Sequence, residues 1–307
     1  MVSVLLAAFQ GKAFLPEQLA SLRAQNVDFR VLWQDDGSVD GTFDMLDAIT
    51  VMDGRFRPGT QQGLHLGAAG NFLSLMAQDD APYTALCDQD DIWREDKLRR
   101  GLNALQHAEQ KYGADTPLLV HHDCRLVDAA GYMLRASFFR HQGWDPAAND
   151  LPHLLVQNNV TGCTLMMNAA LRRLVVAHAP EQQIMHDWFI ALTAAAFGHI
   201  LYLPDTLVDY RQHGSNAQGA SRFPLLVRAL GALRAPARAK ERIRLTYRMA
   251  RAFREAYGES LPRAAALQVD RYLAIGAMPR KARLQALCQG GYLMQSRITR
   301  LGQRFFG

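Results

Sequence analysis

The chain has 307 residues, of which 49% are hydrophobic and 21% charged, so its length and composition are those of a folded globular protein and exclude a disordered or fibrous one. Its four cysteines form no CxxC pair, which argues against a disulfide framework or a structural zinc site and favours a reducing cytoplasm. The net charge of +5 conceals an acidic body, residues 1–220 at −9, and a basic segment, residues 221–307 at +14. That basic segment indicates an anionic partner such as a lipid surface or a nucleic acid.

The first ninety residues alternate between strand and helix patterns. Apolar runs at 2–9, 29–33 and 83–87 predict buried strands, and helical spacing predicts helices over 14–24, from about 40 to 49, and within 63–78. Residues 2–9 lack a basic flank and are too short for a signal peptide or a membrane span. The alternation predicts an α/β fold with a mostly parallel sheet, in which ligands bind at the carboxyl ends of the strands.

The second half of the chain continues the alternation and then changes character. Further strands are expected at 118–122 and 201–203, and helices at 165–177 and 185–197. From residue 224 onward the sequence predicts Arg- and Ala-rich helices interrupted at Pro236, Pro262 and Pro279. We therefore expect a catalytic or binding domain over 1–220 and a basic helical extension over 221–307.

An acidic cluster follows the strand predicted at 83–87. Asp88, Asp90 and Asp91 bring three carboxylates into four positions, and a hard divalent cation with oxygen ligands relieves their repulsion best. Mg²⁺ or Mn²⁺ held in this way usually takes further ligands from substrate phosphates, which favours a phosphorylated substrate. The alternative is that the cluster only caps a helix.

Three further motifs carry polar groups that suit a site. Asp35 and Asp36, in an Asp-Asp-Gly-Ser turn, are suited to bind a ribose or a base, or else they only build an Asx-type turn. Asp187 enters an apolar helix as a lone acid, so it is either a general base with Trp188 offering a face to a sugar, or an N-terminal cap before a core tryptophan.

The last of these motifs is a basic loop. Arg211 suits a diphosphate, and His213 suits either the metal or a phosphate. A basic loop of this kind makes sense beside the acidic cluster if an anion and a cation lie between them. The alternative is a solvated surface loop.

Taken in order, these motifs resemble the family 2 glycosyltransferases of the GT-A fold, especially the rhamnosyltransferase-like members that build bacterial cell-surface polysaccharides. The resemblance covers residues 2 to about 220. It is carried by Val4 to Gln10, the Asp35-Asp36-Gly37-Ser38 turn, Asp88 to Trp93 with Lys97 and Leu98, Asn159 to Asn168, His186-Asp187-Trp188, and Tyr210 to Asn216.

The resemblance implies a role for each motif. The nucleoside of a sugar donor would contact Ala8, Asp35 and Asp36. A Mg²⁺ or Mn²⁺ ion would be held by Asp88, Asp90 and Asp91, with Asp90 the main ligand and His213 a further candidate. Asp187 would be the catalytic base, and Arg211 and His213 would close over the diphosphate. Thr161, Gly162 and Trp188 would lie on the acceptor side.

Two departures from the family's pattern bear on donor preference. His65 stands where many relatives have Asn, and Phe9 and Gln10 stand where they often have Tyr or Thr with Asn. Both places would lie near the nucleotide. We therefore expect them to affect which base or sugar the protein accepts.

The predicted function is inverting, metal-dependent transfer of a sugar, with L-rhamnose as a candidate, to a hydroxyl of a cell-surface glycan or a lipid-linked acceptor. The basic extension predicts peripheral attachment to the anionic inner face of a membrane, or a helical cap on the catalytic domain. Two alternatives are a sugar nucleotidyltransferase, whose opening Gly-rich loop is missing, and a nucleic-acid-binding protein, for which we find no recognised module. We expect no nucleic-acid partner.

Overall fold

The computed structural model describes residues 1–180, 185–213 and 236–306. Within these ranges nine strands join in one sheet, in the order β3-β2-β1-β4-β8-β6-β9-β5, with β7 paired to β6. The strands are β1 (Val2–Ala8), β2 (Phe29–Asp35), β3 (Phe56–Pro58), β4 (Tyr83–Asp88), β5 (Ile92–Trp93), β6 (Leu118–Asp128), β7 (Met133–Arg135), β8 (Met166–Asn168) and β9 (His199–Gln212).

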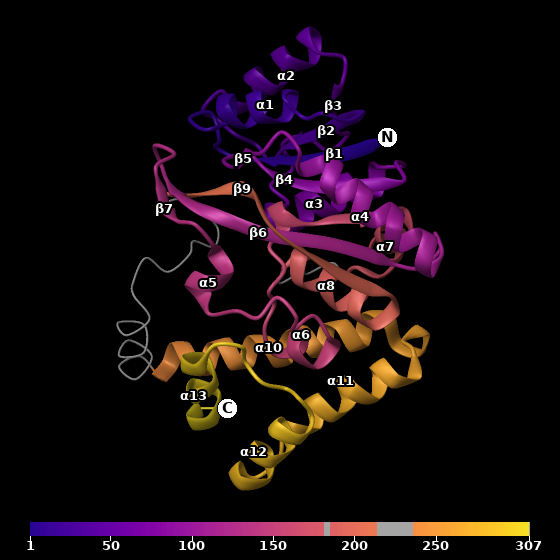
Figure 1. Ribbon diagram of the computed structural model, residues 1–307, viewed down its shortest axis with the longest axis vertical. Helices are drawn as coiled ribbons and strands as arrows, with labels where there is room; N and C mark the ends of the chain where they lie inside the picture. The colour runs from indigo at the N-terminus through magenta and orange to yellow at the C-terminus, as the bar shows by residue number, and fades with distance from the viewer. Residues whose placement is uncertain (181–184, 214–235, 307) are drawn as a thin grey trace. The chain divides into compact units, whose positions relative to one another are not determined.

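The first half of the sheet is parallel, as the strand-helix alternation predicts. Strand β1 lies between β2 and β4, and all three run in the same direction, as does β3 beside β2. The helices that join them are α1 (Leu15–Arg23), α2 (Thr42–Met52) and α3 (Gly67–Gln78). Because parallel crossovers are right-handed, the reversal of strand order at β1 places α3 on the face opposite α1 and α2 (Figure 1). The carboxyl ends of β1, β2 and β4 therefore meet at one edge, which is where such folds bind ligands.

The second half of the sheet mixes directions. Strands β6 and β9 are parallel, whereas β8 is antiparallel to both β4 and β6, and β5 is antiparallel to β9. Helices α4 (Lys97–Tyr112), α7 (Ala169–His178) and α8 (His186–Phe197) belong to this part of the chain, and η1 (Gly162–Thr164) is a single 3₁₀ turn. The helix expected from residue 165 begins only at Ala169, because residues 166–168 pair with both neighbouring strands.

The core explains why these strands are continuous apolar runs. The side chains of Val4, Leu5 and Leu6 in β1 are fully buried, as expected for a strand covered on both faces. Among the described residues, no helix combines the length and apolar character needed to cross a membrane.

The chain divides into two compact units that interleave along the sequence. Unit 1 comprises residues 1–138, 160–194 and 198–213, and unit 2 comprises residues 139–159, 195–197 and 214–307. The boundary expected near residue 220 lies outside the described residues. The segment 139–159, which we expected to belong to the first domain, clusters with the C-terminal helices instead.

The C-terminal helices begin where the prolines predict. Helix α10 (Pro236–Tyr257) starts at a proline, and Pro262 and Pro279 are the N-caps of α11 (Arg263–Ile275) and α12 (Arg280–Gln289). The other helical elements are α5 (Phe138–Gln142), α6 (Leu151–Val156), η2 (Gly258–Ser260) and α13 (Arg297–Phe306). Helix α6 packs against α10 and α11, so the basic segment has an apolar core of its own.

Candidate active site

The acidic cluster lies in the turn between β4 and β5, at the edge where the parallel strands end. We call residues 88–91 the acid loop. Asp91 is fully buried and Asp90 is 9% exposed, whereas Asp88 is half-buried. The carboxylates thus lie at three depths, from the surface of the site inward. Among the described residues, Oδ2 of the buried Asp91 has no hydrogen-bond partner.

Two residues at the end of β9 hold this loop. Nε2 of His213 lies 2.6 Å from Oδ2 of Asp90, and the His213 ring stacks on Phe14 at 4.4 Å. The Arg211 guanidinium donates to the carbonyl of Asp90 (2.9 Å) and the carbonyl of Ala129 (2.6 Å), and it pairs with Glu17. Arg211 is only 2% exposed, so it braces the acid loop from inside and is not the solvated side chain that the alternative interpretation predicted.

A buried lysine lies behind the cluster. Lys97, at the first position of α4, is 1% exposed, and its ammonium lies 3.3 Å from the centre of the Trp93 ring. Burial lowers the pKa of Lys97 to about 8, against the attraction of nearby thiol and carboxyl groups. This ammonium offsets part of the negative charge of the loop from its interior side.

The electrostatics of the cluster suit a cation. Burial raises the pKa of Asp88 to about 7, with the neighbouring charges of Asp90 and Asp187 adding to the shift. Burial and the same like-charge repulsion also raise the pKa of Asp91. Ligand atoms of Asp88, Asp91 and Cys163 lie within 4.8 Å of one another, and Cys163 was not foreseen as a member of this group. The unpartnered carboxylate oxygen and the crowded acids fit a divalent cation.

Asp187 lies in the first turn of α8, close enough to the acid loop for its charge to raise the pKa of Asp88. Its carboxylate accepts N–H bonds from Trp188 (2.7 Å) and from Gly162. Burial outweighs these bonds and raises the pKa of Asp187 to about 7. A carboxyl group that titrates near neutral pH is well suited to general base catalysis.

The residues expected on the acceptor side differ in how close they lie to Asp187 and in how exposed they are. Gly162 lies against the pair His186 and Asp187, since a Cβ on it would stand 3.0 Å from Nε2 of His186. Thr161, its neighbour, is half-buried. Trp188 is only 5% exposed, so its ring lies in the interior and offers little surface to a sugar. Residues 181–184 and 214–216, at the ends of two of the motifs, lie outside the described residues.

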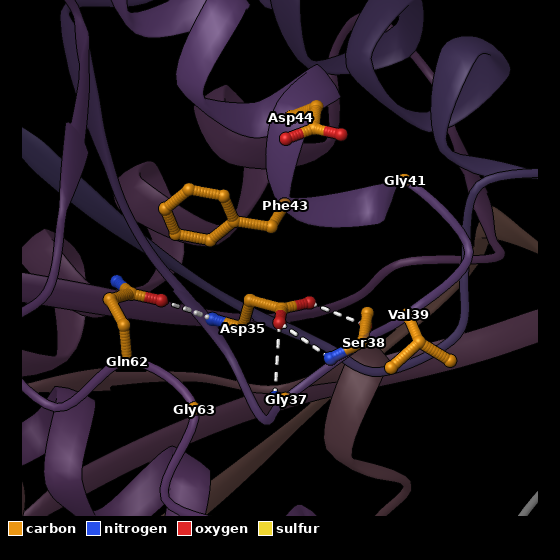
Figure 2. A pocket seen from close by; sticks show the side chains of 9 residues that line it. All are labelled: Asp35, Gly37, Ser38, Val39, Gly41, Phe43, Asp44, Gln62 and Gly63. Atoms are coloured by element: carbon orange, nitrogen blue, oxygen red, sulfur yellow. Dashed lines mark hydrogen bonds between the residues drawn. The ribbon is translucent and has the colours of Figure 1, made fainter.

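Asp35 ends β2 and Asp36 follows it, and both carboxylates accept backbone N–H groups. Asp35 accepts the N–H groups of Gly37 (3.0 Å) and Ser38 (2.8 Å) and the Ser38 hydroxyl, which is the Asx-type turn that the sequence left open (Figure 2). Asp36 accepts the N–H groups of Leu66 and Gly67 at the start of α3. Oδ2 of Asp35 already accepts two N–H groups, whereas Oδ1 of Asp35 and each oxygen of Asp36 accept one of these donors. Since a carboxylate oxygen can accept two hydrogen bonds, neither arrangement excludes a ligand.

A hollow of about 360 Å³ opens beside this turn (Figure 2). Gly37 and Gly41 line it with positive φ angles of 95° and 93°, which glycine adopts without strain. The remaining lining residues are Asp35, Ser38, Val39, Phe43, Asp44, Gln62 and Gly63. Asp36 is not among them, so the two acids of the motif face different surroundings.

The loop after β1 completes this edge. The carbonyl of Ala8 accepts the N–H of Asp36 (2.8 Å), which links the ends of β1 and β2. Phe9 is half exposed and meets His65 edge to face, with ring centres 6.5 Å apart. The two family departures, Phe9 and His65, therefore contact each other.

Unit 1 thus brings together the acid loop, Asp187, Gly162, Arg211 and His213. Sequence reasoning assigned no site role to Lys97, Cys163 or Glu17. Cys163 and Glu17 meet partners far away in the chain, whereas Lys97 contacts Trp93, four residues before it.

The arrangement of this sheet and its helices is the GT-A fold, and solved structures share it. TarS from S. aureus (residues 1–349, in complex with UDP-GlcNAc) superposes with a TM-score of 0.58 at 15% identity, over 89% of this chain and 71% of that one. A mannosyltransferase from Pyrobaculum calidifontis, PcManGT, in complex with GDP-Man and Mn²⁺, gives a TM-score of 0.52 at 12% identity, over 99% and 87% of the two chains.

The sequence comparisons identify the family. The family model described as "Glycosyl transferase family 2" matches residues 3–174, which is more than half of the chain. The dTDP-rhamnosyl transferase RfbG of Shigella flexneri is 25% identical in an alignment 246 residues long that covers 75% of this chain and 79% of the relative. An uncharacterized glycosyltransferase of Nostoc is 23% identical over 223 residues, 70% of this chain and 66% of that protein. The chain belongs to glycosyltransferase family 2, and it is a glycosyltransferase with the GT-A fold.

Proposed function

We propose that the protein transfers a sugar from a nucleoside-diphosphate donor to an acceptor hydroxyl in one displacement that inverts the anomeric configuration. The supporting observation is that Asp187, whose pKa is raised to about 7, lies within electrostatic reach of the acid loop. A single displacement requires one general base, here with a pKa near neutral, beside one cluster that binds a cation. Family membership favours this reaction over a sugar nucleotidyltransferase or a nucleic-acid-binding protein.

In this mechanism Asp187 accepts the proton of the acceptor hydroxyl while that oxygen attacks the anomeric carbon. The proton passes to a carboxylate oxygen, the bond from oxygen to the anomeric carbon forms, and the bond to the diphosphate breaks. Thr161 and Gly162 lie on the acceptor side, and the backbone N–H of Gly162 orients the base. Asp35, Asp36 and Ala8 hold the nucleoside.

Asp88, Asp90 and Asp91 would hold Mg²⁺ or Mn²⁺, with His213 orienting Asp90. When bound, such a cation neutralises charge on the departing diphosphate. Arg211 contributes by fixing the backbone of Asp90, and it reaches a phosphate only by exchanging one of its present bonds. The structure of PcManGT carries Mn²⁺ and GDP-Man, which supports a donor and metal of this class here.

A donor screen tests this proposal. UDP-, dTDP- and GDP-sugars, with dTDP-L-rhamnose first because RfbG is named a dTDP-rhamnosyl transferase, are supplied with Mn²⁺ or Mg²⁺ and released nucleoside diphosphate is measured. We expect turnover of at least one donor, its loss in EDTA, and a loss of about 10²-fold or more in Asp90→Asn with the fold retained. Full activity in Asp90→Asn or in EDTA contradicts the metal assignment.

We also propose that the acceptor is a cell-surface glycan or a lipid-linked saccharide, reached from the cytoplasmic face of a membrane. The support is the basic segment 221–307, with 18 Lys and Arg against 4 Asp and Glu. Many of these side chains are exposed on α10 to α12, as attraction to anionic lipids requires. The apolar core shared by α6, α10 and α11 supports a structural role for the same helices, and the two roles are compatible.

A further inference from the structure

Gln89, the middle residue of the acid loop, bonds to the loop that follows β1. Its Oε1 accepts the N–H of Phe9 (2.7 Å) and its Nε2 donates to the carbonyl of Phe9 (2.6 Å). The β1–β4 ladder ends one residue earlier, at the pair Ala7 and Asp88. Because a carboxamide carries the same donor and acceptor as a peptide group, the side chain of Gln89 extends this ladder by one rung.

This bond pair belongs to an ordered set. We call residues 9–12 the first loop, and each of its four N–H groups is accepted by a side chain. Gln10, Gly11 and Lys12 donate in turn to Ser38 (2.8 Å), Thr42 (2.9 Å) and Asp40 (3.0 Å), which lie in the turn after β2 and at the start of α2. Phe9 alone of these four donates to the acid loop, through Gln89. Gln89 therefore joins the nucleoside side of the site to its metal side.

The glycine in the first loop makes room for this side chain. A Cβ on Gly11 would stand 2.0 Å from Oε1 of Gln89 and 2.2 Å from its Cδ, and the other nearest atom is also part of Gln89. Gly11 has no positive φ angle, so the demand for glycine comes from space and not from backbone strain. Gln89 and Gly11 thus form a matched pair, 78 residues apart in sequence.

We propose that Gln89 is a positioning residue that fixes the first loop against the acid loop, so that the nucleoside and the diphosphate of one donor are bound at a set separation. This inference rests on the proposed function, because it takes the donor to be a nucleoside diphosphate that spans both loops. Because Gln89 holds the first loop in place before the donor binds, less conformational entropy is lost when the donor binds. Its loss therefore weakens donor binding more than it slows the chemical step.

Nucleotide binding to Gln89→Ala tests the positioning role. UDP, dTDP and GDP are titrated with Mn²⁺ into wild type and variant, and the tightest binder of the wild type is used as the probe. We expect its Kd to rise about tenfold, as the loss of two backbone hydrogen bonds implies, while kcat at saturating donor changes less than about twofold. Gln78→Ala is the matched control, because Gln78 also bridges two backbone groups, Thr60 and Ser74, while its hydrogen bonds reach neither the first loop nor the acid loop.

A double-mutant cycle with Gly11→Ala tests the pairing. Alone, Gly11→Ala displaces Gln89 and should raise the same Kd about tenfold. In the Gln89→Ala background it should add less than about twofold, because the atoms that its Cβ would meet are gone. Additive effects, near a hundredfold in the double variant, contradict the pairing.

Amide hydrogen exchange separates this inference from the proposed function, since it needs no ligand. Exchange at Phe9 should quicken at least tenfold in Gln89→Ala and remain unchanged in Gln78→Ala. An unchanged exchange rate at the Phe9 amide would contradict the claim that Gln89 fixes the first loop. Faster exchange with an unchanged nucleotide Kd makes Gln89 merely structural. If the wild type binds no nucleoside diphosphate, the donor assignment and the positioning role both fall, while the exchange result still decides whether Gln89 fixes the first loop.

Discussion

At the scale of single residues, Asp187, which we propose as the catalytic base, carries a cost to stability. The residue is 8% exposed, and burial raises the pKa of its carboxyl group from 3.8 to about 7 although it lies at a helix N-terminus and accepts backbone N–H bonds. Those features ordinarily lower a carboxyl pKa, so desolvation is the larger effect here. Only the deprotonated form can accept a proton from the acceptor.

The pH profile of turnover therefore follows this group. We expect kcat to rise about tenfold per pH unit below pH 7 and to level off by about pH 8, because only the carboxylate acts as a base. Asp187→Asn should lower kcat by about 10² to 10⁴-fold with little change in donor Kd, and should remove this acidic limb. A variant that keeps the limb, or loses donor binding as much as turnover, contradicts the assignment.

The same substitution should stabilise the fold at high pH. A native pKa above the unfolded value means that the wild type loses stability as pH rises from about 4 to 7, and the loss is complete above 7. Asp187→Asn avoids this loss, so its Tm should exceed that of the wild type at pH 8 and not at pH 4, by about 2–4 °C for each kcal/mol recovered. Thermal unfolding at both pH values measures it, and an equal change in Tm at both would contradict the cause.

At the scale of elements, two glycines show how tightly the second half of the sheet is packed. Gly198 precedes β9, and a Cβ there would stand 1.8 Å from the carbonyl oxygen of Pro117, next to the start of β6. Gly101 in α4 faces Met166, where a Cβ would meet Sδ at 2.2 Å. The backbone carbonyl of Pro117 cannot move away from an added Cβ as easily as the flexible side chain of Met166 can.

We therefore expect Gly198→Ala to destabilise the protein by about 3 kcal/mol or more and Gly101→Ala by about 1 kcal/mol. Gly54→Ala is the control, since nothing lies within 4 Å of its added Cβ and its effect should be small. Urea unfolding of the three variants measures how much each substitution lowers the free energy of unfolding. Equal costs for Gly198→Ala and Gly101→Ala would show that the start of β9 shifts freely.

Sequence reasoning was reliable for elements with a long apolar period and poor for short ones. The strands β1, β2 and β4 are seven, seven and six residues long with mostly buried side chains, and their positions were predicted. Strands β5 and β8 have two and three residues, too few for any periodicity, so the antiparallel pairings that they make were not foreseen. The extent of β9, fourteen residues, was missed because Pro204 interrupts its apolar run.

The site was predictable where a motif is contiguous and not where it depends on distant contacts. The acid loop and Asp187 were found as carboxylates in apolar surroundings. The brace between Arg211 and Asp90 spans 121 residues, and the bonds between Gln89 and Phe9 span 80. No local pattern encodes such pairs, since they exist only once the strands are assembled.

At the scale of the whole molecule, charge is divided as the proposed membrane role requires. The segment 221–307 carries +14, and in α10 the side chains of Arg244, Arg248 and Arg251 are exposed at helical spacing on one face. Removing the segment is a poor test, because helix α6, with Leu154 and Leu155 buried, packs on α10 and α11. Neutralising exposed arginines leaves that core in place.

The variant with Arg244, Arg248 and Arg251 all changed to Gln should bind anionic vesicles about 10²-fold more weakly at low salt, since each contributes about 1 kcal/mol near an anionic leaflet. The control changes three exposed arginines of unit 1, Arg57, Arg99 and Arg173, to Gln, which removes the same charge from elsewhere. Cosedimentation with phosphatidylglycerol vesicles measures the affinity, which should also fall as salt shortens the Debye length. If both triple variants weaken binding equally, net charge and not this helix face governs it. If the wild type fails to bind at low salt, these helices serve only as packing, and the sugar transfer proposed for unit 1 is unaffected.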